Sequence, residues 1–181
     1  ARELFKNNYK VRISVLDFSN KESEDFKINI KKIANIGISY IVKTSDLIIK
    51  TNEVIIDSIF GNGLNRVVKN NFAKIIKAIN NSNSIILSVD MPSGLFADDN
   101  RNNNIIVKAN VTYTFQCVKL SFLLPSYQKY TGKIKVINIG LSNSFFEFVE
   151  SKMFLLTYDN IVKLKKRLKL SHKGNFGHAL L

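Results

Sequence analysis

Two carboxylates in this sequence, Asp57 and Asp90, directly follow short apolar runs, which makes them candidates for shared chemistry. Asp57 follows the run at residues 54–56, and Asp90 follows the run at residues 85–89. If both runs are neighbouring parallel strands, their carboxyl ends lie at one edge of a sheet, where α/β proteins bind ligands. The sequence therefore predicts that Asp57 and Asp90 share a single pocket.

The loop after Asp57 has the composition of a phosphate-binding turn. Gly61 and Gly63 allow the backbone to turn sharply and to expose N–H groups, and Arg66 adds positive charge. The helix predicted to follow would point its positive end at the same anion. A Gly-x-Gly spacing matches neither the full dinucleotide fingerprint nor a P-loop, so a tight turn capped by Asp57 remains an alternative.

The turn after Asp90 offers oxygen ligands. Pro92 fixes the turn, Ser93 carries a hydroxyl, and Gly94 permits an unusual backbone angle. Together with Asp57, these residues would suit a cation that is bound without histidine or thiolate. Two alternatives stay open, because one carboxylate could instead be an acid or base catalyst, or the segment could be only a capped turn.

Four single residues complete the candidates. Lys119 follows a predicted strand toward the same sheet edge and could contact a substrate, although a surface lysine is the simpler interpretation. His172 and His178 have no acidic or cysteine partner at ligand spacing, so we interpret them as structural. Cys117, the single cysteine, is interpreted as a packing residue, and its isolation fits a reducing compartment. We therefore expect a cytoplasmic protein.

The elements that must position these residues alternate between strand and helix. Strands are predicted at residues 9–16, 39–42, 54–56, 84–89, 107–115, 119–124 and 133–139, and helices at 22–36, 67–80 and 145–148. The strand at 54–56 is expected to be buried, because it is apolar without alternation. Strand, helix and strand in succession form the βαβ unit, so we predict an open, mostly parallel sheet with helices on both faces.

Length and charge restrict the class of protein. The chain has 181 residues, enough for one domain with a real core. Its net charge of +13 comes from lysines that are spread over the whole chain, with one dense cluster at residues 163–169. A small molecule that carries phosphate would match this charge as well as a nucleic acid. No aromatic residues alternate with these lysines in a binding stripe, so we expect no nucleic acid as a partner. No apolar run is long enough for a membrane helix, so we expect no membrane partner either.

Four segments in this order and spacing resemble the NAD(P)H-hydrate epimerase family. They lie at residues 57–64, 90–95, 109–119 and 132–140. The resemblance covers about residues 1–141 and implies a Rossmann-like, three-layer α/β/α fold with a mostly parallel sheet. It also implies that the chain interconverts the R and S forms of hydrated NADH or NADPH, as part of a bifunctional epimerase and dehydratase and as a homo-oligomer.

The resemblance also implies roles for single residues. Asp57 and Ser93 would hold a potassium ion, and Asp90 would contact the substrate and move the proton. The substrate's phosphate or ribose would be held by Gly61, Asn62, Gly63, Leu64, Asn65, Arg66 and Val67.

The same resemblance divides the chain into two parts. Residues 1–150 would form the epimerase domain, without its first strand and without an Asn-Asn-Gly-Gly-Asp loop that is expected before Ala1. Residues 151–181 would be a linker and the start of an ADP-dependent dehydratase domain, so the chain would be truncated at both ends. The alternative is a non-catalytic nucleotide-binding or protein-interaction module of the same fold.

Overall fold

The computed structural model describes residues 1–18, 23–98, 105–150, 153–156, 158, 170 and 172. The chain divides into two compact units, Ala1–Leu141 and Ser142–Leu181. Most of the predicted dehydratase start, including His178, lies outside the described residues. In the described part of the chain, every helix is too short or too polar to cross a membrane.

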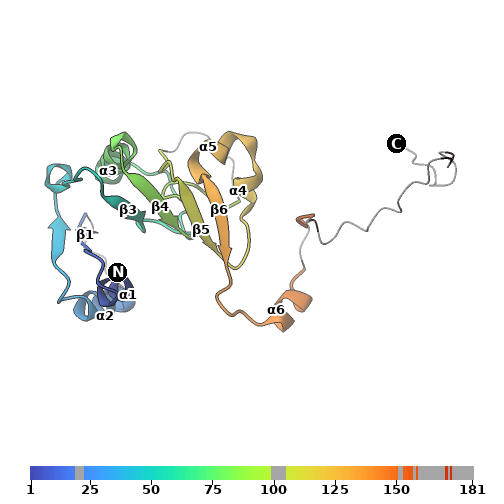
Figure 1. Cartoon of the computed structure of the whole chain (residues 1–181), viewed down its shortest axis with the longest axis horizontal. Helices are drawn as coiled ribbons and strands as arrows, with labels where there is room; N and C mark the ends of the chain where they lie inside the picture. Colours follow the sequence, from blue (N-terminus) through green and yellow to red (C-terminus); the bar gives the residue numbers. More distant parts are fainter. Residues whose placement is uncertain are drawn as a thin grey trace. The chain divides into compact units, whose positions relative to one another are not determined.

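Strands and helices mostly alternate along the first unit, although β5 follows β4 with no helix between them in the described residues (Figure 1). The strands are β1 (Ile13–Leu16), β2 (Ile38–Ile41), β3 (Val54–Asp57), β4 (Ile85–Val89), β5 (Val111–Phe115) and β6 (Lys133–Ile137). The helices are α1 (Arg2–Lys6), α2 (Glu24–Lys32), η1 (Thr44–Asp46), α3 (Asn70–Asn81), α4 (Leu120–Leu123), η2 (Pro125–Tyr127) and α5 (Gln128–Thr131). The second unit contributes α6 (Asn143–Phe148).

All strand pairs in the described structure are parallel. β3, β4, β5 and β6 form one sheet in that order, and β1 pairs with β2 in a second sheet. Parallel strands joined by helices give the three-layer, Rossmann-like α/β fold, which confirms the predicted fold class. In the described residues the strands form two sheets instead of the single sheet that was predicted.

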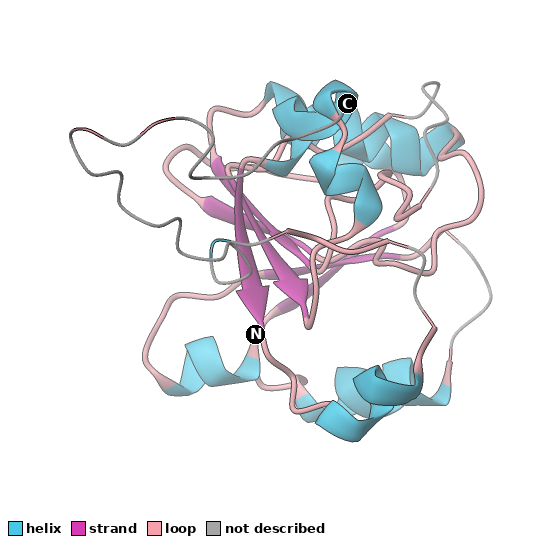
Figure 2. Ribbon diagram, turned by 90° about the vertical axis from the view of Figure 1, so that its right-hand side faces the viewer, coloured by secondary structure: helices cyan, strands magenta, loops and turns pink. Residues whose placement is uncertain are grey.

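The two buried clusters of the larger sheet lie under helices on one of its faces. Ile75, Ile76 and Ile79 of α3 are buried in one cluster with Ile86 of β4. A second cluster places Phe122 of α4 against Met91, Leu95 and Ile106 and against Tyr127 of η2. Figure 2 shows these helices above the twisted strands. The apolar residues of the helices therefore pack against the loop after β4 and fix its position. This loop carries part of the candidate site.

The other face of β3 is exposed, so the prediction that residues 54–56 are buried is wrong. Val54 and Ile56 have exposed fractions of 53% and 47%. Ile55 packs against the α3 cluster, and Asp57 is buried on the same side. Successive side chains of a strand point to opposite faces, and in the described residues only the face under α3 is closely covered at this strand.

The predicted strand at residues 119–124 is also wrong, because this segment forms the helix α4. A short apolar run fits a buried strand and a buried helical turn equally well. Phe122 is buried here, whereas Leu123 beside it is 47% exposed. Helices α4 and α5 together connect β5 to β6, so β6 lies parallel to β5.

Several boundaries are shifted from their predicted positions. Strand β1 begins at Ile13 instead of residue 9, and helix α2 ends at Lys32 instead of residue 36. Helix α3 begins at Asn70 instead of residue 67, and its N-cap, Lys69, makes no capping hydrogen bond through its side chain. Strand β5 begins at Val111 instead of residue 107. The residues before it bond elsewhere, since Val107 N–H donates to the Ser93 carbonyl and Ala109 N–H donates to the Tyr130 carbonyl.

Candidate functional site

Asp57 and Asp90 lie at the carboxyl ends of two adjacent parallel strands. Asp57 is the last residue of β3 and is in register with Ser88 of β4. Asp90 directly follows Val89, the last residue of β4. The loop between them contacts both carboxylates, since Ile59 N–H donates to Asp57 and Asn62 N–H donates to Asp90. The predicted neighbouring strand ends are therefore present, and one loop connects the two acidic groups.

Asp57 is a buried carboxylate that is surrounded by donors. Its exposed fraction is 1%. Oδ2 accepts hydrogen bonds from the Ser93 N–H and the Ser88 hydroxyl, both at 2.8 Å, and Oδ1 accepts from the Ser93 hydroxyl at 2.5 Å. Burial raises the pKa of Asp57, and the hydrogen bonds from Ser93 and Ser88 oppose that rise only in part.

Ser93 links Asp57 to the backbone of Phe60. The Phe60 N–H donates to the Ser93 hydroxyl at 2.8 Å, and the Phe60 carbonyl oxygen lies 3.2 Å from the same hydroxyl. A carboxylate, a hydroxyl and a carbonyl oxygen therefore lie together, and these are ligands that hard cations prefer. In the described residues no group of three or more His, Cys, Asp or Glu side chains could hold a metal.

We expect Asp57→Asn to remove a pH-dependent loss of stability. Burial raises the pKa of Asp57 above its ordinary value of 3.8, so the folded state binds this proton more tightly than the unfolded state. The contribution of protonated Asp57 to the free energy of unfolding is complete below about pH 3.8 and is lost as the pH rises through the raised pKa. In buffers without potassium, urea unfolding of both proteins from pH 3.5 to 7 should show the wild type weakening relative to the variant as pH rises. A constant difference would contradict this expectation.

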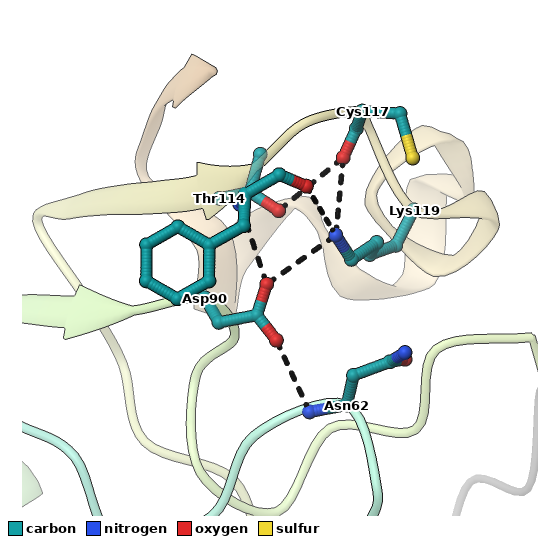
Figure 3. A network of polar contacts seen from close by, with 6 residues as sticks. Asn62, Asp90, Thr114, Cys117 and Lys119 are labelled. Carbon is teal, nitrogen blue, oxygen red and sulfur yellow. Dashed lines mark hydrogen bonds and ion pairs between the residues drawn. The ribbon is translucent and has the colours of Figure 1, made fainter. Parts of the chain in front are cut away.

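Asp90 has an unusual backbone conformation and three contacts through its carboxylate. Its φ is 66°, in the left-handed region, and its N–H donates to the Tyr113 carbonyl at 2.7 Å. Oδ2 accepts from the Asn62 N–H at 3.2 Å, and Oδ1 accepts from the Phe115 N–H at 3.3 Å. Oδ1 also lies 3.3 Å from Nζ of Lys119 (Figure 3). These contacts aim the carboxylate between the glycine loop and the turn after β5.

The interpretation of Lys119 as a surface lysine is wrong. Its side chain is only 12% exposed, because Nζ is held by the carbonyl oxygens of Phe115 and Cys117 as well as by Asp90. The interpretation of Cys117 as a packing residue is also wrong, since its thiol is free and exposed. The chain turns just before it, where Gln116 has φ 63°. This turn directs the carbonyl oxygen of Cys117 at Lys119 and leaves the thiol outside.

The structure separates the predicted substrate-binding residues into two groups. Leu64, Arg66 and Val67 line a cavity of about 260 Å³ at the start of α3. The rest of the lining is Phe60, Val68, Lys69, Asn70 and Phe72. Asn62 lies at Asp90, which is not among the lining residues. Gly61, Gly63 and Asn65 are exposed and do not line the cavity.

The loop turns at residues 61–64 as predicted, because the Leu64 N–H donates to the Gly61 carbonyl at 3.3 Å, but the turn does not demand glycine. Neither Gly61 nor Gly63 has a positive φ. A Cβ on Gly63 would meet nothing within 4 Å, and one on Gly61 would lie at an ordinary 3.5 Å from Oδ2 of Asp90. Gly94 does have the predicted unusual angle, with φ 98°. The position that requires glycine is therefore Gly94, in the turn after Asp90, next to the residue Ser93 that bonds Asp57.

Sequence reasoning missed two side chains of the site, Ser88 and Lys69. Ser88 is fully buried and donates to Asp57. A polar residue within an otherwise apolar strand is a signal that could have revealed it, because buried polar groups need partners. Lys69 lines the cavity beside Arg66, and no pattern in the sequence distinguishes it from other lysines.

Comparison with known proteins gives one family and several relatives. The family model described as YjeF-related protein N-terminus matches residues 1–121. An NAD(P)H-hydrate epimerase of Oenococcus oeni is 36% identical over 141 residues, which cover 78% of this chain and 66% of that protein. Bifunctional NAD(P)H-hydrate repair enzymes Nnr of Coxiella burnetii and Thermofilum pendens are 37% and 30% identical over 71% and 99% of this chain. The chain covers only 27% and 35% of these two proteins.

Proposed function

The chain belongs to the YjeF-related N-terminus family, the family of the NAD(P)H-hydrate epimerases, and on this premise we propose that it interconverts the R and S forms of hydrated NADH or NADPH. The observation that carries the proposal is the position of Asp90. Its carboxylate ends a parallel strand and contacts the loop at Asn62, at the sheet edge where this fold binds ligands. The chain spans less than two thirds of the length of each relative named above.

The reaction needs one group that can give and take a proton at the hydrated carbon. The lone pair of the ring nitrogen expels the hydroxyl group, which leaves as water once it has received a proton. The resulting planar cation then adds water from either face, and that water loses a proton. Asp90 supplies the first proton and accepts the second, so its carboxyl group returns to its starting state.

The cavity at the start of α3 is proposed to bind the phosphates of the substrate. Arg66 and Lys69 supply positive charge there, and Leu64 and Phe72 supply apolar contact. Charged donors form strong hydrogen bonds to phosphate oxygens. Asn62 lies at Asp90 and Leu64 at the cavity, so the same loop would hold the dinucleotide at both places.

Asp57, Ser93 and the carbonyl oxygen of Phe60 are proposed to hold a potassium ion. The ion would neutralise the buried carboxylate and so fix the loop that begins at Phe60. Replacing choline chloride by potassium chloride should raise the melting temperature of the wild type, since a ligand at about 100 times its Kd stabilises by about 2.7 kcal/mol. Asp57→Asn should lose most of this increase, and an equal increase in both proteins would argue against the site.

Two predictions from the sequence resemblance stay proposals: that residues 151–181 include the start of an ADP-dependent dehydratase domain, and that the enzyme acts as a homo-oligomer. The epimerase proposal itself is tested by supplying one epimer of the hydrate and separating the two forms by chromatography over time. Formation of the second epimer faster than in buffer supports it. Binding of the dinucleotide without conversion would favour the non-catalytic module.

A further inference from the structure

The ammonium group of Lys119 is enclosed by acceptors. Nζ lies 2.8 Å from the carbonyl oxygen of Phe115, 3.2 Å from that of Cys117 and 3.3 Å from Oδ1 of Asp90. An ammonium group has three N–H donors. Two of these contacts are hydrogen bonds to carbonyl oxygens, and the third is an ion pair with Asp90. Lys119 therefore presents its charge to Asp90, while its hydrogen bonds hold it to the turn after β5 (Figure 3).

The two carboxylate oxygens of Asp90 differ in how much of their capacity is used. Oδ1 accepts from the Phe115 N–H and faces the Lys119 ammonium group. Oδ2 accepts from the Asn62 N–H. A carboxylate has about two lone-pair sites on each oxygen. Within the described residues, Oδ1 therefore carries a hydrogen bond and an ion pair, whereas Oδ2 carries a hydrogen bond only.

We infer that Lys119 is a positioning residue: its ammonium group pairs with Oδ1 of Asp90 and leaves Oδ2 as the oxygen that transfers the proton. This inference rests on the proposed epimerase function. The left-handed backbone of Asp90 does not aim its side chain as an ordinary strand residue would, so the partners of the carboxylate set its direction. Oδ2 faces the loop, since a Cβ on Gly61 would lie 3.5 Å from it. Lys119 thus acts through Asp90 and does not touch the reacting carbon.

The first test is the variant Lys119→Met, assayed in the complete polypeptide. We expect kcat to fall by about 10–100-fold, part of the contribution of a positioned acid or base. KM should change by less than about threefold, because Arg66 and Lys69 still line the cavity. Lys119→Arg keeps the charge and should recover part of kcat. Lys133→Met, an exposed lysine on β6, is the matched control and should change neither constant.

The double variant Asp90→Asn with Lys119→Met separates positioning from independent action. If Lys119 acts only through Asp90, the double variant is no slower than Asp90→Asn alone. Losses that multiply would overturn the inference. So would unchanged turnover in Lys119→Met, or a loss confined to KM.

A readout that does not need activity separates this inference from the proposed function. The backbone amides of Asn62 and Phe115 both donate to Asp90, so their NMR signals should shift in Lys119→Met and remain in place in Lys133→Met. If the wild type does not epimerise the hydrate, the proposed function fails, and these signals still decide whether Lys119 positions Asp90. Unshifted signals in folded Lys119→Met would overturn the positioning role, and Lys119→Arg provides the same readout if the methionine variant does not fold.

Discussion

Asp90→Asn is expected to slow epimerisation by about 10²–10⁴-fold, which corresponds to about 3–5 kcal/mol in activation free energy. An amide cannot supply a proton to the leaving hydroxyl group or accept one from the incoming water. Asparagine tolerates the left-handed region, so the φ of 66° at this position should persist. The amide oxygen can still accept from the Phe115 N–H, which keeps the turn after β5 in place.

The measurement is the initial rate at which one epimer forms the other, together with a thermal melt of the same sample. Asp25→Asn is the matched control, because Asp25 is exposed in the first turn of α2. The control should keep the wild-type rate. Turnover of Asp90→Asn within about threefold of the wild type, with a normal melt, would remove Asp90 from the chemistry.

The positions of Asp57 and Asp90 could be predicted from the sequence because they depend on local pattern. Each follows an apolar run that forms a strand, and a helix connects the two runs. Parallel pairing follows from that connection, so both carboxylates had to lie at one edge. Gly94 was predictable for a similar reason, since the turn at residues 91–94 contains both proline and glycine.

The role of Lys119 could not be predicted, because its burial depends on a turn at Gln116 for which the sequence carries no turn signal. Gln116 adopts φ 63° without being glycine or asparagine. This turn brings the carbonyl oxygens of Phe115 and Cys117 to the Lys119 ammonium group. The exposure of Val54 was unpredictable for a different reason. An apolar strand shows that both faces can be buried, but the covering elements decide which faces are.

Gly94→Ala is expected to destabilise the protein by about 3–5 kcal/mol, at the upper end of single substitutions. An added Cβ would lie 2.1 Å from the carbonyl oxygen of Ile105 and 3.1 Å from the Cα of Ile106. Both are backbone atoms, so no side chain can rotate away. The φ of 98° adds strain for any residue with a Cβ. The loop at residue 105 must therefore move, although it is packed beside the buried turn.

Gly140→Ala separates the clash from the backbone strain. Gly140 has φ 78°, but a Cβ there would meet nothing within 4 Å, so its expected cost is only about 1–2 kcal/mol. Urea unfolding midpoints of the two variants give the difference directly. Because Gly94 follows Ser93, whose N–H and hydroxyl both bond Asp57, a displaced turn should also weaken the potassium-dependent rise in melting temperature in Gly94→Ala and leave it intact in Gly140→Ala. Equal destabilisation of the two variants would show that the loop at residue 105 yields. An equal potassium-dependent rise in both would show that the Asp57 site does not depend on the close approach at Gly94.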